Sequence, residues 1–473
     1  MLKGKQQEIL NLPYDGHGVV CGVAGSGKSF CAIKRAEFIE KVTNKKVLIL
    51  SYNNSLINYM KDISGIKSSN IDLTTYHKFA TNCMRNNKLL GYNDILSSDK
   101  EVEKLIDNAI ENTIEKEGDI TTLKRKSFLK DEIKWMQHFG ALTKDVYEHI
   151  DRVGRGSANL RKADRKYVFS VYEEYVKLRS AKGHKYDWDD LAYYFNNLLC
   201  NKNIEPQYGC IIIDEGQDFS PMMIKSIVNY INNKGSVLYL GDRGQQIYGK
   251  GKMSWKNLGL KIRKAYTLDE NHRNTKQIEK LANIIRENLN LDIEDGIVSL
   301  NSITNGPKPK IISLENKENE DKYIINLLKE YENNGSTCII FRKNKEVTNF
   351  IETLNNNNIY PIQIDKNTTK FNLTNGIFIG NYHSVKGLEF DNVIIARCSN
   401  SILEDVNKIP DKIKKELTES ELDAYKKEQG ELLAKLIYVA ITRAKTNLVI
   451  TTSDEIISII PRDTEICDFY ESR

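Results

Sequence analysis

The sequence predicts an α/β protein with two domains, each built on a parallel sheet, and with a helical segment inserted into the first domain. Short runs of β-branched residues recur along the chain, and a helical pattern follows each run, as in parallel α/β folds. The runs form two groups, one before residue 270 and one after residue 335. Within the first group, residues 85–185 have almost no strand pattern. A chain of 473 residues is long enough for two or three domains.

The predicted strands are short and almost wholly apolar, as expected for strands that are buried on both faces of a parallel sheet. The first group consists of residues 18–22, 46–51, 210–213 and 236–240, and the second of residues 338–341, 376–380, 393–396 and 447–451. We therefore assign residues 1–84 and 186–272 to the first domain and residues 273–473 to the second.

The inserted segment, residues 85–185, is highly charged and helical in pattern. Its second half, residues 151–185, holds ten Lys and Arg against four Asp and Glu. Such a surplus fits either a solvated helix face or a surface that faces nucleic acid. The whole chain has a formal net charge of +5, which permits a polyanionic partner without requiring one.

The composition excludes several classes of protein. The eight cysteines form no CxxC pair, so a zinc or iron–sulfur site is not supported, and reduced thiols of a cytosolic protein are expected. No window approaches 18 uninterrupted apolar residues, and residues 1–11 have no apolar signal core. We therefore expect a cytoplasmic protein with no membrane span.

A phosphate-binding pattern follows the first predicted strand. Residues 22–29 read GVAGSGKS, match GxxxxGK[ST] and precede a helical pattern. Glycines let backbone N–H groups approach phosphates closely, and the N-terminus of the helix attracts the same charge. We expect Lys28 to reach the β- and γ-phosphates and Ser29 to hold Mg²⁺. The nucleotide-binding residues of this loop are Gly22, Val23, Ala24, Gly25, Ser26, Gly27, Lys28 and Ser29.

An acidic motif, IIIDEGQD, spans residues 211–218 and ends another predicted strand. Asp214 can hold Mg²⁺, and Glu215 can orient the water that attacks the γ-phosphate. Two acids at a strand end can also be an ordinary polar terminus. Beside a phosphate loop, however, the pair predicts hydrolysis of the nucleotide rather than binding alone.

At this acidic motif the sequence begins to resemble the superfamily 1 helicases of the UvrD/Rep/PcrA type, in which DExQD is typical. Further elements follow in the order of that family. They read ILSYNNSLINYMK (49–61), TTYHKFA (74–80), YDWDDLAYYF (186–195), LYLGDRGQQIYG (238–249), LDENHRNT (268–275), CIIFRKN (338–344), YHSVKGLEFDNVII (382–395) and YVAITRAK (438–445). The resemblance implies two RecA-like P-loop NTPase domains that share one ATP and its Mg²⁺ ion in the cleft between them.

The resemblance also implies roles for residues around the nucleotide. Gln6 takes the position of the glutamine that reads adenine, and Gln245 that of the glutamine that senses the γ-phosphate. Arg273 would contact the γ-phosphate, Arg443 would act as an arginine finger, and Glu389 completes the ATP-binding set. The catalytic residues are then Lys28, Glu215, Gln245, Arg273 and Arg443.

The same resemblance places a single strand of DNA across both domains. The candidate contact residues are Tyr52, Asn54, Tyr76, His77, Arg342 and His383. Aromatic rings stack on bases with little sequence preference, at about 1–3 kcal/mol each. Tyr52 and Tyr76 can equally cap the core beneath the motif loops. Single-stranded or partly duplex DNA is the expected partner, and RNA stays open because phosphate and stacking contacts discriminate sugars poorly.

The sequence departs from the family pattern at three places. His272 replaces the tyrosine that stacks on adenine in the family. The family's base-stacking tryptophan is out of register, which leaves open whether Trp255 replaces it. Only residues 345–381 lie between the elements at 338–344 and 382–395, where relatives insert a large accessory domain. The chain therefore resembles a trimmed motor.

Three hypotheses on function remain. The first is an ATP-driven DNA helicase or translocase on single-stranded DNA, moving 3′ to 5′ as the resemblance implies. The second is a DNA-sensing ATPase subunit that signals to a protein partner such as a nuclease, for example in anti-phage defence, with little unwinding of its own. The third, a nucleotide-gated binding module without turnover, is disfavoured by Glu215 and Arg443. The sequence leaves open the pathway, whether DNA repair or defence, and the oligomeric state.

Overall fold

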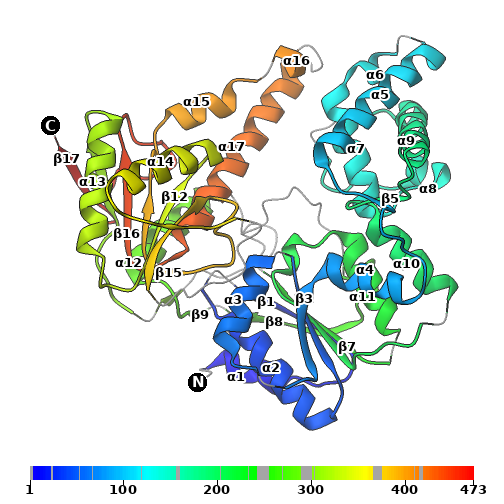
Figure 1. Cartoon of the computed structure of the whole chain (residues 1–473), viewed down its shortest axis with the longest axis horizontal. Helices are drawn as coiled ribbons and strands as arrows, with labels where there is room; N and C mark the ends of the chain where they lie inside the picture. The colour runs from blue at the N-terminus through cyan, green and yellow to red at the C-terminus, as the bar shows by residue number, and fades with distance from the viewer. Residues whose placement is uncertain are drawn as a thin grey trace.

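The structure of the chain is a computed structural model that describes most of its residues. The described ranges are 4–22, 25–52, 54–66, 68–118, 120–155, 160–202, 204–232, 234–241, 255–268, 270–288, 301–302, 304–365, 375–409, 411–414 and 419–472. Within these ranges, Figure 1 shows two α/β regions side by side, with a group of helices above the first. In the same ranges, no helix combines the length and the apolar character needed to cross a bilayer.

The first α/β region is built on a parallel sheet that has six strands among the described residues, in the order β3-β2-β6-β7-β1-β8. Its strands are β1 (His17–Gly22), β2 (Val47–Ser51), β3 (Ile71–Thr75), β6 (Cys210–Ile213), β7 (Ser236–Gly241) and β8 (Ile262–Leu268). The register pairs Cys21 with Gly241 and Ile213 with Tyr239. Because the strands are parallel, the loops after β1 and β6 therefore leave the sheet at the same edge.

Helices cover both faces of this sheet. They are α1 (Lys5–Leu10), α2 (Lys28–Thr43), α3 (Asn54–Ser64), α4 (Tyr76–Asn86), α10 (Leu191–Asn201) and α11 (Pro221–Ile231). Successive residues of a strand face opposite sides, so Val19 packs in the core below α4, α10 and α11, whereas Val20 packs in the core below α1, α2 and α3. The sheet is thus buried on both faces, which explains why its central strands are apolar runs.

The group of helices above this region has a hydrophobic core of its own, which includes Leu105, Ile133 and Tyr175. It consists of α5 (Asp99–Glu117), α6 (Thr121–Lys124), α7 (Lys126–Phe139), α8 (Lys144–His149) and α9 (Arg165–Ala181). Two short paired strands, β4 (Ile95–Leu96) and β5 (Tyr186–Asp187), join it to the first α/β region. We call these helices the helical group.

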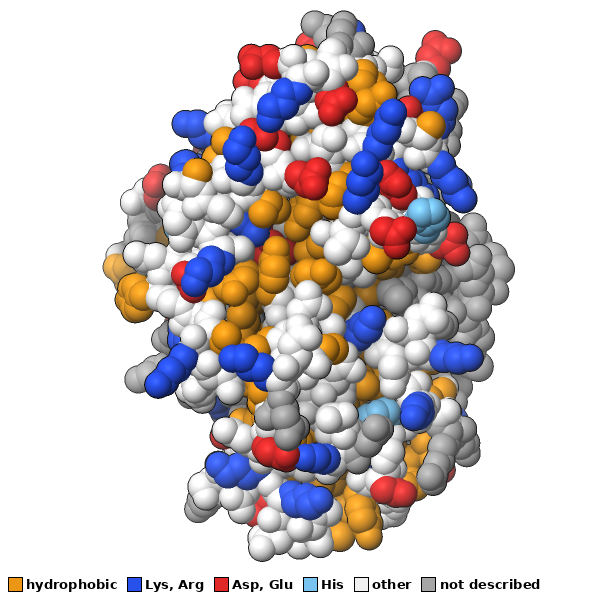
Figure 2. Space-filling model, turned by 90° about the vertical axis from the view of Figure 1, so that its right-hand side faces the viewer, with side chains coloured by type: hydrophobic (Ala, Val, Ile, Leu, Met, Phe, Trp, Pro, Cys, Tyr) orange, Lys and Arg blue, Asp and Glu red, His pale blue; other side chains and the backbone are white. Residues whose placement is uncertain are grey.

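Several of the arginines of residues 151–185 form ion pairs inside the helical group. Arg152 and Arg155 bind the carboxylate of Glu132, which is fully buried, at 2.6 and 2.9 Å. Arg179 is also fully buried and bonds Asp187 at 2.9 Å. Figure 2 shows that Lys and Arg alternate with Asp and Glu on the outer face of this side of the molecule. These arginines therefore stabilise the fold and are not available to a nucleic acid.

The second α/β region is built on another parallel sheet, which has seven strands in the described part of the chain. Their order is β13-β14-β12-β15-β16-β11-β17. The strands are β11 (Lys310–Leu314), β12 (Ser336–Phe341), β13 (Ile362–Gln363), β14 (Gly376–Asn381), β15 (Phe390–Ile395), β16 (Ala444–Thr452) and β17 (Asp468–Ser472). The helices are α12 (Lys276–Asn288), α13 (Lys317–Glu330), α14 (Asn344–Asn356), α15 (Ser401–Asn407), α16 (Asp411–Lys414) and α17 (Glu419–Ile441). A short parallel pair, β9 (Glu270–Asn271) and β10 (Asn301–Ser302), lies between the two sheets in the chain.

The predicted α/β class with parallel sheets is confirmed. Each strand expected from an apolar run is present, with its ends shifted by no more than three residues. Among the described strands longer than two residues, the sequence did not reveal β3, β8, β11 and β17. Three of these lie at sheet edges, where a strand is covered less fully and needs no continuous apolar run. The assignment of domain boundaries along the chain stays a prediction.

We expect Glu132→Ala to lower the free energy of unfolding by about 3 kcal/mol, because it leaves Arg152 and Arg155 partly buried without their counter-charge. Urea unfolding curves measure this change. The control is Glu111→Ala, which removes an exposed partner of Lys126 from the same helical group and should change the free energy by no more than about 0.5 kcal/mol. Equal effects of the two substitutions would contradict this account of the helical group.

Candidate active site

The loop between β1 and α2 has glycines where the backbone and its neighbours require them. Gly25 and Gly27 both have φ of 78°, in the left-handed region that favours glycine. A Cβ atom on Gly25 would overlap the side chain of Asn271, and one on Gly27 would lie 2.7 Å from Nε2 of Gln6. Side chains from α1 and from β9 therefore pack directly against the loop.

The start of α2 meets the end of β6. Lys28 is buried, and its ammonium group donates to the carbonyl of Gly22 at 2.9 Å. The hydroxyl of Ser29 donates to Oδ2 of Asp214 at 2.6 Å. Ser29 and Asp214 are far apart in the chain, and they meet because β1 and β6 end at the same edge of the sheet.

Asp214 and Glu215 are both buried, with exposed fractions of 0% and 8%. Burial, and then the charge of Glu215, raise the pKa of Asp214. Burial also opposes ionisation of Glu215, but Lys28, Lys386 and Arg443 outweigh it and lower its pKa. The backbone of Glu215 has φ of 51°, which is uncommon for a residue other than glycine and is found at sites under functional constraint.

The residues at this point fit a divalent cation. Oδ1 of Asp214 is buried and has no hydrogen-bond partner among the described residues. Its other oxygen already contacts the hydroxyl of Ser29. A carboxylate and a hydroxyl are oxygen ligands of the kind that Mg²⁺ takes. A buried acceptor that lacks a donor is the feature that such an ion would satisfy.

The second α/β region contributes positively charged side chains to the site. Arg443 follows α17 and is buried, and its guanidinium donates to the carbonyls of Val439 and Leu388 at 2.9 and 3.0 Å. Burial, and then the positive charge of Arg273, lower the pKa of Arg443 to about 10. A guanidinium whose charge is disfavoured by burial and by a second arginine marks a place that an anion would stabilise.

Arg273 lies after β9 and reaches the second sheet. Its Nε donates to Oε2 of Glu389 at 2.6 Å, and Lys445 lies 3.4 Å from the other oxygen of that carboxylate. Burial alone would raise the pKa of Glu389, but Arg273 and Lys445 outweigh it and hold the pKa at about 2. The neighbouring Asn274 donates to the carbonyl of Thr442 at 3.2 Å. These bonds tie the segment after β9 to the loop beside Arg443.

A further ion pair joins the two regions, and the sequence motifs gave it no role. Lys386 of the second region lies 2.5 Å from Asp218 of the first, and both side chains are only 2% exposed. The hydroxyl of Tyr59, on α3 of the first region, also reaches the second region by donating a hydrogen bond to Glu389. The available signal was that Asp218 and Lys386 each stand in a recognised motif, which predicts a role for the charge but does not identify its partner.

Two residues predicted to meet the nucleotide base border the phosphate loop. Gln6 donates from Nε2 to the carbonyl of Ser26 at 3.0 Å. The backbone N–H of His272 donates to the carbonyl of Gly25 at 3.0 Å, and its ring lies 3.4 Å from Glu270. Val23, Ala24 and Gln245, which complete the predicted nucleotide set, lie outside the described residues.

The residues predicted to contact nucleic acid do not all point to a surface. Tyr76 is 0% exposed, and its hydroxyl is 2.7 Å from that of Ser226, so the prediction that its ring contacts a base is wrong in this structure. Its place in the core follows from its position at the first turn of α4, beneath the sheet edge. This outcome is the alternative that the sequence left open for Tyr76.

Tyr52 and His77 are only half-buried and lie in an aromatic cluster with Trp188. The rings of Tyr52 and His77 are 6.5 Å apart, and those of His77 and Trp188 are 5.2 Å apart. Trp188 was not predicted, although its motif, YDWDDLAYYF, was recognised. Trp255 packs its ring edge on Tyr239 at 4.8 Å, as part of the outer layer of the first core.

The other candidates are dispersed over the two regions. Asn54 is exposed at the start of α3, and His383 is exposed after β14. The atoms packed around one side of the His383 ring desolvate it, and this effect, followed by the charge of Lys386, lowers its pKa although the residue is exposed. Arg342 follows β12 and lies 3.7 Å from the carboxylate of Asp405. The structure therefore brings Tyr52 and His77 together, and a shared surface for the other candidates stays a prediction.

Comparison with known proteins covers most of the chain. The family model for the UvrD/REP helicase N-terminal domain matches residues 2–258, and that for the UvrD-like helicase C-terminal domain matches residues 266–371 and 361–455.

The curated relatives match this chain over only part of their own length. A probable DNA helicase II homolog of Mycoplasma genitalium is 23% identical over 390 residues, which are 74% of this chain and 53% of that protein. DNA helicase II of Escherichia coli is 22% identical over 378 residues, which are 73% of this chain and 49% of that protein. The human TPR and ankyrin repeat-containing protein 1 is 31% identical over 128 residues, which are 26% of this chain and 4% of that protein. The chain spans about half the length of the two helicase relatives.

We expect the buried pair of Lys386 and Asp218 to couple the two α/β regions strongly. A double-mutant cycle with Lys386→Met and Asp218→Asn should give a coupling energy of about 2 kcal/mol or more, because each charge is desolvated. The matched control is Lys343→Met with Asp405→Asn, an ion pair of similar length that is exposed and should couple by less than about 1 kcal/mol. Urea unfolding measures both cycles, and equal coupling energies would refute the inter-region role of the buried pair.

Proposed function

This chain belongs to the UvrD/REP helicase family, and from that premise we propose that it is an ATP-driven motor that moves on single-stranded DNA. The observation that supports this most directly is the surroundings of Glu215. Lys28 of the first α/β region and Lys386 and Arg443 of the second all act on this one carboxylate. A triphosphate bound beside Glu215 would therefore contact charges from both regions.

In this proposal the two regions are the motor domains, with residues 1–84 and 186–272 in the first, residues 273–473 in the second, and residues 85–185 as the inserted helical subdomain. ATP would be bound by the loop of residues 22–29, with Gln6 and His272 beside the base.

Mg²⁺ would be held by Ser29 and Asp214, where it neutralises charge on the β- and γ-phosphates. Glu215 would accept a proton from the attacking water, a role that suits a carboxylate kept ionised by surrounding cations.

The present partners of Arg273 and Arg443 suggest how a bound nucleotide would act on the two domains. Arg273 is now paired with Glu389, and Arg443 is now bonded to backbone carbonyls. A γ-phosphate would compete for both guanidiniums and so change the contacts between the domains. Such an exchange of partners gives ATP a differential affinity for closed and open arrangements, which is what a motor requires. Movement in the 3′ to 5′ direction is part of the proposal and is supported by the family resemblance alone.

The proposed DNA contacts are the aromatic cluster of Tyr52, His77 and Trp188, together with Asn54, Arg342 and His383. Partly exposed rings can stack on successive bases without reading their sequence. The relatives are named as DNA helicases, which supports DNA rather than RNA as the partner.

A second candidate function is a DNA-sensing ATPase subunit that acts on a protein partner such as a nuclease. The connection between β12 and β14, residues 342–375, favours it. That connection is too short for a domain of ordinary size, so an accessory domain for strand separation has no room there.

We expect Lys28→Ala to lower kcat/KM for ATP at least about 100-fold, because the cation that faces the β- and γ-phosphates is lost. Glu215→Gln should retain nucleotide binding but lose turnover to a similar degree. Lys34→Ala is the control, since Lys34 lies on the same helix and pairs with Glu37 near the surface. Phosphate release with and without single-stranded DNA measures all variants. A fully active Lys28→Ala variant, or an ATPase that no nucleic acid stimulates, would disprove the motor.

Strand displacement distinguishes the two candidate functions. The isolated chain should separate a duplex with a 3′ single-stranded tail in the presence of ATP and Mg²⁺, and should leave a duplex with a 5′ tail intact. DNA-stimulated ATPase activity without displacement of either substrate would favour the sensing subunit. A fluorescent reporter strand provides the measurement, and the Glu215→Gln variant provides the baseline.

A further inference from the structure

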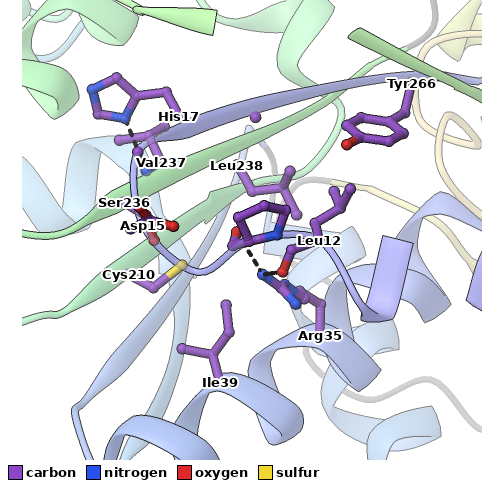
Figure 3. Close-up of a pocket in the computed structure, with 13 residues that line it drawn as sticks. Leu12, Asp15, His17, Arg35, Ile39, Cys210, Ser236, Val237, Leu238 and Tyr266 are labelled. Carbon is purple, nitrogen blue, oxygen red and sulfur yellow. Dashed lines mark hydrogen bonds between the residues drawn. The ribbon is translucent and has the colours of Figure 1, made fainter. Parts of the chain in front are cut away.

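The helix that begins with Lys28 carries a second buried cation. Arg35 is 2% exposed, and its guanidinium donates to the carbonyls of Leu10, of Leu12 at 2.6 Å and of Pro13 at 3.0 Å. Figure 3 shows the guanidinium pointing at this stretch of backbone rather than at a carboxylate. Arg35 thus holds the end of α1 and the turn after it.

The helix α1 needs such a contact because it has only six residues. Helices of this length are not stable in isolation, and the carbonyls at their C-terminal end have no partner inside the helix. A cation at that end satisfies the carbonyls and interacts favourably with the helix dipole. Ile9 and Leu12 add apolar contacts to the core below, but Arg35 supplies the directional bonds.

The other face of α1 contacts the phosphate loop through Gln6. The amide of Gln6 donates to the carbonyl of Ser26, and its nitrogen lies where a Cβ atom on Gly27 would meet it. Arg35 follows Lys28 by two helical turns, so one face of α2 carries both cations. Helix α2 therefore makes two contacts: Lys28 bonds the phosphate loop, and Arg35 bonds the end of α1, the helix that carries Gln6.

We infer that Arg35 is a positioning residue for nucleotide recognition, which holds α1 so that Gln6 stays beside the phosphate loop and selects adenine. This inference rests on the proposed function. A glutamine amide matches the donor and acceptor of adenine at N6 and N7, whereas guanine presents two acceptors at the corresponding edge. A displaced Gln6 would lose this selectivity while Lys28, on its own helix, still meets the phosphates.

The helical group offers a matched control. Arg165, on α9, is 7% exposed and donates to the carbonyls of Tyr147, Glu148 and Ile150 at 2.8–3.0 Å. These carbonyls close α8, which also has six residues. Arg165 therefore holds the end of a short helix as Arg35 does, but it lies in the helical group and not beside the nucleotide loop.

The experiment compares Arg35→Lys, Arg35→Gln and Arg165→Lys in the full chain. Arg35 borders a cavity of about 60 Å³ that is lined also by Ile39 and Cys210 (Figure 3), and Lys and Gln, which are smaller than Arg, cause no overlap there. Thermal unfolding is measured first, and we expect similar decreases in Tm for Arg35→Lys and Arg165→Lys. KM and kcat are then measured for ATP and for GTP.

The expected result is a KM for ATP raised about tenfold in Arg35→Gln, with kcat changed less than about threefold, and a ratio of ATP to GTP efficiency that falls toward one. Arg35→Lys should restore part of the loss, because an ammonium group can still donate to these carbonyls. Arg165→Lys should leave KM and selectivity unchanged. A change in Tm alone for the Arg35 variants would overturn the inference.

A cycle with Gln6→Ala tests whether Arg35 acts through Gln6. If it does, Arg35→Gln should add almost nothing to the loss of selectivity already caused by Gln6→Ala. Additive effects would overturn the inference. Dissociation constants for fluorescent mant-ATP and mant-GTP provide the same comparison without turnover. If the unaltered chain does not hydrolyse ATP, the proposed motor is disproved. The dissociation constants for mant-ATP and mant-GTP would still decide the role of Arg35.

Discussion

The arrangement of this protein depends on how two adjacent carboxylates are accommodated in its interior. Asp214 and Glu215 end a central strand and are almost completely buried, and two neighbouring negative charges in such a place repel each other strongly. The hydroxyl of Ser29 and the cation Lys28 relieve this repulsion from the same sheet, while Lys386 and Arg443 relieve it from the other. The electrostatic requirement of one dipeptide therefore draws two separate sheets toward a common site.

The contacts described between the two α/β regions are also ion pairs and hydrogen bonds of buried polar groups. Lys386 of the second region pairs with Asp218 of the first, and the hydroxyl of Tyr59 of the first bonds Glu389 of the second. Arg273 and Asn274 tie the segment after β9 to Glu389 and to the backbone beside Arg443. Buried charges need specific partners, because a charge left alone in the interior is costly. These bonds define how the regions face each other, and any anion that enters the site must exchange partners with the same side chains.

Two short helices in this chain, α1 and α8, are held at their C-terminal ends by buried arginines. Arg35 closes α1, and Arg165 closes α8 in the helical group. In both cases the guanidinium satisfies backbone carbonyls that a six-residue helix leaves without donors. A buried arginine with several donors suits this purpose, since one side chain can bind the carbonyls of several neighbouring residues. The need for such donors explains why Arg152, Arg155, Arg165 and Arg179 are turned inward, whereas the other basic residues of 151–185 are exposed.

The sequence by itself determined the parallel α/β class, the central strands and the phosphate loop, because buried parallel strands need apolar runs and phosphates need glycine backbones. It also determined which residue types meet at Asp214 and Ser29, although not their distance. Only the tertiary structure decided the edge strands β3, β8 and β17, the burial of Tyr76 and the pairing of Lys386 with Asp218. Edge strands carry no distinctive apolar run, and an aromatic ring beside a motif can face either core or solvent. The partner of a buried charge lies far away in the chain, and only the packing of two sheets brings it within reach.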